Sequence, residues 1–205
     1  MKKLIQVLLV VVVIGLAYLL YREFATPMEF QRIMDHRKEA VVNRMKDIRL
    51  AQRAYRTAYQ RFTPSMDSLM NFVKYDSLTY ERAVGSMDDS LAVAQGRIVR
   101  EQFKVAVRDT VFVGRNLTNN DIDQFQFIPF GDGKKIMMDA GTLETGSGVM
   151  IQVFEAKAPY KDFLDVEEYH QELVNLIDNQ KTLRRYPGVQ VGSMTEATNE
   201  AGNWE

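Results

Sequence analysis

The first part of the chain contains a long run of apolar residues without a single charge. From Leu4 to Leu20 it reads LIQVLLVVVVIGLAYLL, in which only Gln6 is fully polar. As a helix these seventeen residues would span about 25 Å, close to the minimum for a single membrane crossing, and the ring of Tyr21 suits the headgroup region at its end. The pattern predicts an N-terminal transmembrane anchor over residues 1–25, on the positions Leu4, Leu8, Val12, Leu16, Leu20 and Tyr21.

Two other interpretations of this run stay open, a cleaved signal peptide and a buried helix of a soluble domain. The apolar region of a signal peptide has about 7–15 residues and ends in small residues before the cut. Here the run is longer, and a cut after Ala25 would leave Glu23 at the third position before it, so we favour an uncleaved anchor. Lys2 and Lys3 precede the run, and basic residues favour the cytoplasmic side. We therefore expect a single-pass protein of the bacterial inner membrane, with a cytoplasmic N-terminus and a periplasmic domain.

A helix start follows the apolar run directly. Thr26 can cap a helix, Pro27 suits its first position, and Glu29 completes a capping box. Neither Gly nor Pro occurs again before Pro64. We therefore expect a separate stalk helix over residues 26–62.

Apolar residues recur at helical spacing in the second half of this stalk. The spacings of three, four and seven place them on one stripe, which predicts that residues 41–62 pack on the domain. Arg37 and Arg44 interrupt the stripe nearer the membrane, and residues 27–40 are therefore expected to form a more exposed neck. The positions predicted to pack are Val41, Met45, Ile48, Tyr55, Tyr59 and Phe62.

Residues 63–194 combine short helical and strand patterns and predict an α+β domain. An amphipathic helix is expected over residues 65–74, and a final helix, which Asp165 can cap, up to about Arg184. The whole fold expected is therefore α+β: an N-terminal transmembrane helix, a long stalk helix packed on an antiparallel sheet, and a C-terminal helix.

The strands of this domain are predicted from alternating apolar and polar residues. Turns as short as those at residues 131–133 and 144–148 require antiparallel neighbours, and Pro129 places its strand at an edge. Residues 75–100 are weakly patterned, with a loop over 85–89. The expected strands span residues 103–113, 125–130, 135–143 and 149–158, and a last one spans 189–191.

Composition excludes several classes of function. The 205 residues are 46% hydrophobic and 26% charged, with a net charge of −1, which is typical of a globular chain and gives no support for nucleic-acid binding. A chain without cysteine has no disulfide, thiolate zinc site or cysteine nucleophile. Its two histidines, His36 and His170, lie far apart, and the acidic run 119–123 has Gln124 where an EF-hand needs glycine. We therefore expect no catalytic residue, no metal site and no cofactor.

The charges are divided unevenly along the chain. Residues 22–61 hold ten basic and five acidic side chains, whereas residues 62–205 hold fourteen and twenty-two. The basic segment is interpreted as a solvated helix face, or as a surface for anionic lipid or a neighbouring molecule. The polar tail, residues 195–205, is expected to be either disordered or anchored on the domain or a partner. The candidate partner contacts are Arg49, Arg53, Arg56 and Trp204.

Residues 48–73 combine spaced Ala and Tyr on a helix with a Pro turn and a short Leu-bearing segment, in the string IRLAQRAYRTAYQRFTPSMDSLMNFV. This pattern resembles that of the type IV pilins and the type II secretion pseudopilins, and the resemblance covers about residues 1–75. It implies a long N-terminal helix against an antiparallel sheet. Unlike pilins, the chain has no Gly–Phe junction and no acidic residue before Glu23. The same region and the C-terminal Gly-Asn-Trp-Glu also resemble a group of single-span bacterial envelope proteins without an assigned activity.

Three classes of function stay open at this point. The first choice is a non-enzymatic structural or assembly component of a bacterial envelope complex, anchored in the inner membrane. Its expected partners are the lipid bilayer and either other envelope proteins or copies of itself. The second is a pilin-like or pseudopilin-like subunit of a secretion or pilus system, and the third is a ligand-binding or peptidoglycan-binding module on the same anchor.

Overall fold

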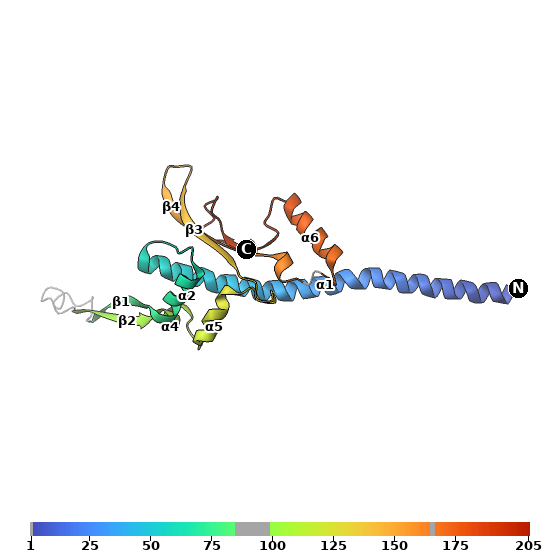
Figure 1. Cartoon of the computed structure of the whole chain (residues 1–205), viewed down its shortest axis with the longest axis horizontal. Coiled ribbons are helices and arrows are strands. Elements are labelled where there is room, and N and C mark those ends of the chain that lie inside the picture. Colours follow the sequence, from blue (N-terminus) through green and yellow to red (C-terminus); the bar gives the residue numbers. More distant parts are fainter. Residues whose placement is uncertain (1, 85–98, 165–166) are drawn as a thin grey trace.

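The described part of the chain combines helices with antiparallel sheets, which confirms the expected α+β class. Figure 1 shows one long helix, with the rest of the described chain gathered around its C-terminal part. The predicted loop over residues 85–89 and the predicted cap Asp165 lie outside the described residues. The computed structural model describes residues 2–84, 99–164 and 167–205, with the backbone alone for Lys2, Leu4 and residues 22–26, 83–84 and 99–100.

The longest element is α1, which spans Lys2–Tyr59 without a break. Its 58 residues reach about 87 Å at the standard rise per residue. The expectation of a separate stalk helix beginning at residue 26 is wrong, since Pro27 lies inside α1. Proline removes only the hydrogen bond to residue 23, and the neighbouring Ala25 and Met28 are good helix formers, so one helix continues through this position. No helix among the described residues is long and apolar enough to cross a membrane.

α1 ends at Tyr59 rather than at the expected residue 62. Gln60 adopts a φ of 56° and its N–H bonds the Arg56 carbonyl at 2.8 Å, which is how a helix closes in a left-handed residue. The helix expected over residues 65–74 is confirmed as α2, Met66–Tyr75.

The packed part of α1 begins earlier than expected. Phe30 and Met34 are each 7% exposed, so the expectation of an exposed neck over residues 27–40 is wrong at these positions. The Phe30 ring lies 5.6 Å from the ring of Tyr169, the residue that precedes α6, His170–Thr182. The chain around the start of α6 therefore covers this part of α1.

The two arginines that interrupt the apolar stripe of α1 reach backbone carbonyls of the domain. Arg37 donates to the Phe163 carbonyl at 2.9 Å, and Arg44 donates to the Gln124 carbonyl. A long side chain can lay its methylene stem along apolar surface while its charged head finds a polar partner. The arginines therefore do not end the packing of α1.

The strands form two antiparallel sheets. β3, Met137–Glu144, β4, Met150–Pro159, and β5, Gly188–Gly192, form one sheet in the order β3–β4–β5. β1, Ser77–Val84, and β2, Val99–Ala106, form a separate two-stranded sheet. The three strands expected over 135–143, 149–158 and 189–191 are confirmed, together with the turn that joins β3 to β4. β1 lies in the weakly patterned segment, for which no strand was expected.

Two expected strands differ from the structure. The strand expected over residues 103–113 ends at Ala106, after which the chain forms α4, Val107–Val111. Residues 125–130 form no strand: the short helices α5, Asn119–Asp123, and η1, Gln124–Gln126, lead into a loop that contains Pro129. The buried pair here is Phe125 and Ile128, and a spacing of three residues suits a helical turn rather than an alternating strand.

The turn at residues 131–133 is also not a hairpin between two strands. It closes a loop whose ends meet in the isolated bridge Phe127–Lys135. The last α-helix, α6, ends at Thr182, close to the expected end, and the 3-10 helix η2, Tyr160–Asp162, precedes it.

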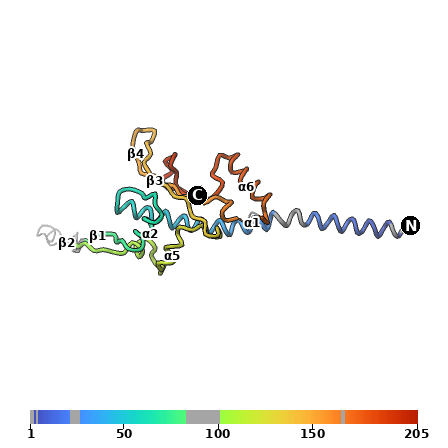
Figure 2. The backbone as a smooth tube through the Cα atoms, viewed as in Figure 1, coloured from blue at the N-terminus to red at the C-terminus, as the bar shows by residue number. Residues whose placement is uncertain are grey.

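The core lies between the packed part of α1, helix α2 and the sheet β3–β4–β5. Val41, Met45 and Ile48 of α1 are fully buried, as are Val189 and Val191 of β5. The two ends of the chain lie apart, with the N-terminus at the free end of α1 and the C-terminus beside its packed part (Figure 2). The molecule therefore consists of a folded domain and a helix that projects from it.

Candidate functional site

The projecting part of α1 exposes apolar side chains on all its sides. From Ile5 to Tyr21 every large apolar side chain is between 51% and 72% exposed. Because this is true of consecutive residues, no face of the helix is covered by the rest of the described chain (Figure 1). The predicted anchor positions in this set are Leu8, Val12, Leu16, Leu20 and Tyr21, whereas only the backbone of Leu4 is described.

The predicted packing positions of the stalk divide into a buried and an exposed group. Val41, Met45 and Ile48 are fully buried, and Phe62, which follows the helix, is 4% exposed. Tyr59 is 48% exposed at the end of α1. Along α1 the predicted packing positions are therefore buried up to Ile48 and exposed at Tyr59, where the helix ends.

Tyr55 lies at the boundary between these two groups and is half-buried. Its ring is 4.6 Å from that of Tyr59 and 5.1 Å from that of Phe72 on α2. The Tyr59 hydroxyl donates to Asp76 Oδ2 at 2.7 Å, and this bond raises the pKa of Tyr59. A cluster of aromatic rings thus forms at the end of α1, exposed at Tyr59 and buried at Phe72.

The predicted partner-contact residues contact the chain's own C-terminal segment, residues 193–205. Arg56 Nη1 lies 2.6 Å from Glu200 Oε1, and Arg53 pairs with the other oxygen of the same carboxylate. Arg49 pairs with Glu205 at 2.5 Å and lies over the ring of Trp204. These arginines follow one another at spacings of three and four residues, so they share one face of α1. The C-terminal segment thus occupies the basic face of the helix.

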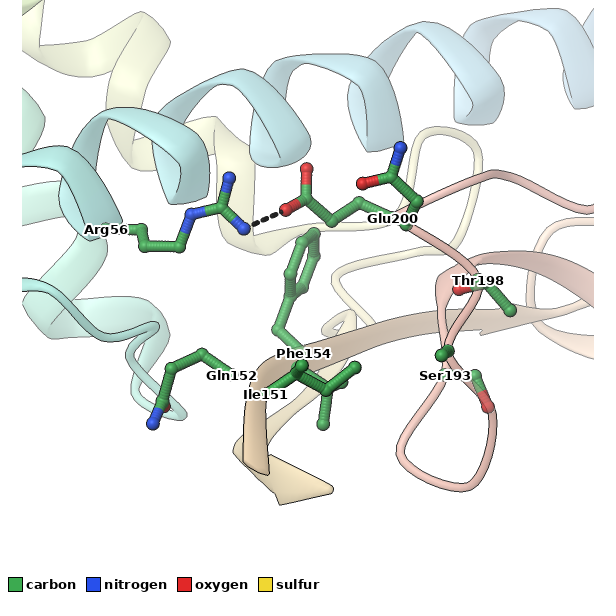
Figure 3. Close-up of a pocket in the computed structure, with 10 residues that line it drawn as sticks. Arg56, Ile151, Gln152, Phe154, Ser193, Thr198 and Glu200 are labelled. Carbon is green, nitrogen blue, oxygen red and sulfur yellow. Dashed lines mark hydrogen bonds and ion pairs between the residues drawn. The ribbon is translucent and has the colours of Figure 1, made fainter. Parts of the chain in front are cut away.

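Glu200 is the centre of this contact. Its side chain is 7% exposed, whereas those of Arg53 and Arg56 are 45% and 44% exposed. Asn199 and Glu200 both have positive φ, at 51° and 62°, a conformation that residues other than glycine adopt rarely and at some cost. From this turn the Glu200 carboxylate points toward Arg56, as Figure 3 shows, and it also pairs with Arg53.

The segment is also attached to β5 by backbone contacts. Gly202 bridges Val191, the Asn203 N–H bonds the Gln190 carbonyl at 3.0 Å, and Asn203 Nδ2 donates to the Gly188 carbonyl at 2.9 Å. Of the two expectations for the tail, the structure therefore shows the anchored one.

A small cleft lies between the C-terminal segment and β4 (Figure 3). Its volume is about 240 Å³, and it is lined by Arg56, Glu200, residues 151–154, Ser193 and residues 197–199. Typical small-molecule pockets range from about 300 to 1,000 Å³. The charged groups that line this cleft neutralise one another, and no Ser–His or Cys–His pair lines it. The cleft therefore lacks the size and the nucleophile–base pair of a hydrolytic site.

The acidic run over residues 119–123 has a local structural role. Thr118 and Asp121 form a capping box at the start of α5, and hydrogen bonds from Thr118 lower the pKa of the Asp121 carboxyl. Within the described residues, no group of three or more His, Cys, Asp or Glu side chains is placed to hold a metal ion.

Gln52 is the most important residue that sequence reasoning missed. It is fully buried on α1, where its side chain donates to the Thr63 carbonyl at 2.7 Å and accepts from the Thr63 N–H at 3.1 Å. These two bonds hold the turn that follows α1 against the helix. The helical spacing could have indicated this burial, because residue 52 lies four positions after Ile48 and three before Tyr55 and so shares the apolar stripe.

A second missed contact joins Asp47 of α1 to Arg115 in the loop after α4. The two form a bidentate pair with distances of 2.6 and 3.0 Å, and the hydrogen bonds with Asp47 raise the pKa of Arg115. No local pattern marks this pair, because its members are 68 residues apart.

Comparison with known proteins finds no family model, curated protein or solved structure that matches the chain.

Proposed function

We propose that the chain is a non-enzymatic, membrane-anchored component that assembles with other proteins of the bacterial envelope. The observation that carries the proposal is the projecting part of α1, whose apolar side chains are exposed on every side while the other half of the same helix is buried in a domain. Soluble monomers rarely expose a continuous apolar surface of this extent. The hydrocarbon of a bilayer can surround a single apolar helix on all its faces.

The described apolar segment of α1 falls short of the usual length of a membrane span, and the proposal therefore requires a bilayer that thins around it. The seventeen described residues from Ile5 to Tyr21 measure about 25 Å, compared with a hydrocarbon thickness of about 30 Å, which a short span accommodates by local thinning. Tyr18 and Tyr21 at one end and Lys2 and Lys3 at the other are residue types that favour the interface. The proposed orientation follows from the two lysines and places the domain outside the cytoplasm.

The domain itself supports an assembly role rather than catalysis. The cleft beside the C-terminal segment is small, and its carboxylate is already paired with arginines of the same chain. Partner proteins would bind the surface of the domain, which the continuous α1 holds at a fixed distance from the apolar segment.

Membrane extraction tests the anchor directly. In Val12→Arg a charge stands in the middle of the apolar segment, where it costs about 2.5–3.5 kcal/mol of insertion free energy. We expect full-length wild-type protein to stay in the membrane fraction after carbonate washing, and the variant to be released in large part. Met28→Arg is the matched control, since Met28 is 74% exposed on the same helix but outside the segment, and it should behave as wild type. Release of the wild-type protein by carbonate would refute the anchor.

A pilin-like subunit is the second candidate, and the continuity of α1 favours it. A single helix that is apolar and free at its N-terminal end and packed on an antiparallel sheet at the other is the arrangement that the resemblance to pilins implies. In such an assembly the free parts of α1 would pack against those of other copies. Mass spectrometry of the protein purified from membranes separates the two candidates, since an intact Met1 counts strongly against a processed pilin.

A further inference from the structure

A shallow groove lies between the C-terminal end of α1 and the start of strand β1. Both segments lie in the part of the molecule that is far from the N-terminus (Figure 1). Its volume is about 510 Å³. Thr57, Ala58 and Tyr59 of α1 line it, as do the first four residues of β1, Ser77–Tyr80. The groove is separate from the cleft beside the C-terminal segment, with which it shares no lining residue.

The groove is bordered by the edge of β1 rather than by one of its faces. Successive side chains of a strand point to opposite faces, so four consecutive residues can line one groove only where the backbone edge faces it. On its other side β1 pairs with β2 along its whole length, from Ser77–Ala106 to Val84–Val99. Within the described residues no strand pairs with the edge that faces the groove. Such an edge offers a row of backbone donors and acceptors to an added strand.

Aromatic side chains surround this edge. Tyr59, Tyr75 and Tyr80 line the groove and are 48%, 73% and 38% exposed. A second shallow groove shares Tyr59 and Tyr75 with the first and continues toward Tyr55, so the aromatic surface is continuous. Tyrosine combines a large apolar ring with a polar tip, and it is enriched where proteins bind other proteins.

The charged residues that line the two grooves indicate which class of ligand can bind there. Among the described residues that line them, Asp76 is the only charged one, and it accepts a hydrogen bond from the Tyr59 hydroxyl. Without Lys or Arg in the described lining, the grooves offer no partner for phosphate or for a nucleic-acid backbone.

We propose that the groove binds an extended peptide segment of a partner protein, which adds to β1 as a third strand and places alternate apolar side chains on the tyrosines. This mode of recognition takes its affinity from main-chain hydrogen bonds and its specificity from alternate side chains. A saccharide chain would use the rings and hydroxyls but would leave the strand edge unfilled, and the edge therefore favours a peptide. A third strand also stabilises a two-stranded sheet, which is marginal alone. This inference rests on the proposed assembly function, for which it names the class of partner.

The test uses the full-length chain in detergent and a phage-displayed library of eight-residue linear peptides. We expect selection to enrich sequences in which apolar residues alternate, and synthetic copies of them to bind the wild-type chain. Tyr59→Ala removes the central ring, and Thr57→Arg fills the groove from an exposed position of α1. Each should weaken binding at least tenfold. Val113→Ala, at a residue that is 79% exposed and outside both grooves, should bind as wild type.

Hydrogen exchange then decides how the peptide binds. Bound peptide should slow exchange at amides of Ser77–Tyr80 and leave the outer amides of β2 unchanged. Enrichment of no peptide, unchanged exchange in β1, or binding of soluble peptidoglycan fragments in place of peptides would each overturn the proposal. Peptide binding in detergent does not depend on membrane insertion, so its failure and the failure of the anchor in carbonate extraction are separate results.

Discussion

Glu200 shows how one acidic residue fixes the C-terminal segment to α1. Its carboxylate is buried while both of its arginine partners stay about half exposed. Loss of the carboxylate would therefore leave two arginines that water can still solvate, and the cost should be below that of a fully buried pair.

Glu200→Gln should lower the free energy of unfolding by about 1.5–3 kcal/mol, the range for a hydrogen bond to a charged group. Denaturant unfolding of the full-length chain in detergent measures this difference. Glu196→Gln is the matched control, because Glu196 is exposed in the same segment, and it should change stability by less than about 0.5 kcal/mol. Equal effects of the two substitutions would contradict the role assigned to Glu200.

The contact between Glu205 and Arg49 predicts a dependence on pH. The hydrogen bond from Arg49 lowers the pKa of the Glu205 carboxyl below its ordinary value of 4.5. A carboxyl with a lowered pKa stabilises the folded state above its ordinary pKa, and this contribution is lost as the pH falls through the folded-state value. Between about pH 5 and about pH 3 the melting temperature should therefore fall more steeply in wild type than in Glu205→Gln. Parallel curves would show that the pair adds nothing to stability.

At the scale of elements, the packed half of α1 is expected to contribute much of the domain's stability. Ile48 is fully buried there, whereas Leu50, two positions later on the same helix, is 41% exposed. Ile48→Ala should cost about 2–5 kcal/mol, the range for a large-to-small change in a core. Leu50→Ala removes a side chain of the same size and should cost less than about 1 kcal/mol. Unfolding curves of the two variants test whether α1 is part of the core or merely lies beside it.

The end of β5 depends on a glycine for a steric reason. Gly192 has a φ of +69°, and a Cβ added there would lie 2.1 Å from the Phe154 carbonyl oxygen. Gly148, in the turn between β3 and β4, has a φ of +77° and open space around it. Both alanine substitutions carry the cost of the left-handed backbone, about 1–2 kcal/mol, but only Gly192→Ala adds a clash with backbone. Its melting temperature should therefore be clearly the lower of the two, and equal values would argue against this close approach of β4 and β5.

The sequence predicted the elements whose pattern is local and missed those that depend on distant contacts. The buried stripe of α1 and the hairpin of β3 and β4 follow from spacing and turn length alone. The segment around Phe125 also alternates, but its burial depends on α1 and α2, which no local pattern reveals. The pairing of Arg53 with Glu200 joins residues 147 positions apart, and for this reason the arginines were interpreted as contacts for a partner.

At the scale of the whole molecule, α1 joins an exposed apolar segment to a folded domain. Its apolar segment ends at Tyr21, and Phe30 follows nine positions later, or about 13 Å along the helix, as the first buried core residue among the side chains that the structure describes after Tyr21. If the apolar segment lies in a bilayer, the domain begins just beyond the headgroups. The aromatic groove at the end of α1 then lies about 57 Å from Tyr21 along the helix axis, where it can meet a partner that the membrane does not hinder.

The orientation of the chain can be tested by cysteine labelling, because the sequence contains no cysteine of its own. A single cysteine introduced at Val113, which is 79% exposed on the domain, should react with a membrane-impermeant maleimide on intact spheroplasts. A single cysteine inserted between Met1 and Lys2 keeps both lysines and should react only after lysis, because basic residues that precede a span favour the cytoplasmic side. The wild-type chain has no thiol and gives the background. Labelling of the N-terminal cysteine on intact spheroplasts, with protection of the cysteine at Val113, would reverse the orientation and place the domain in the cytoplasm.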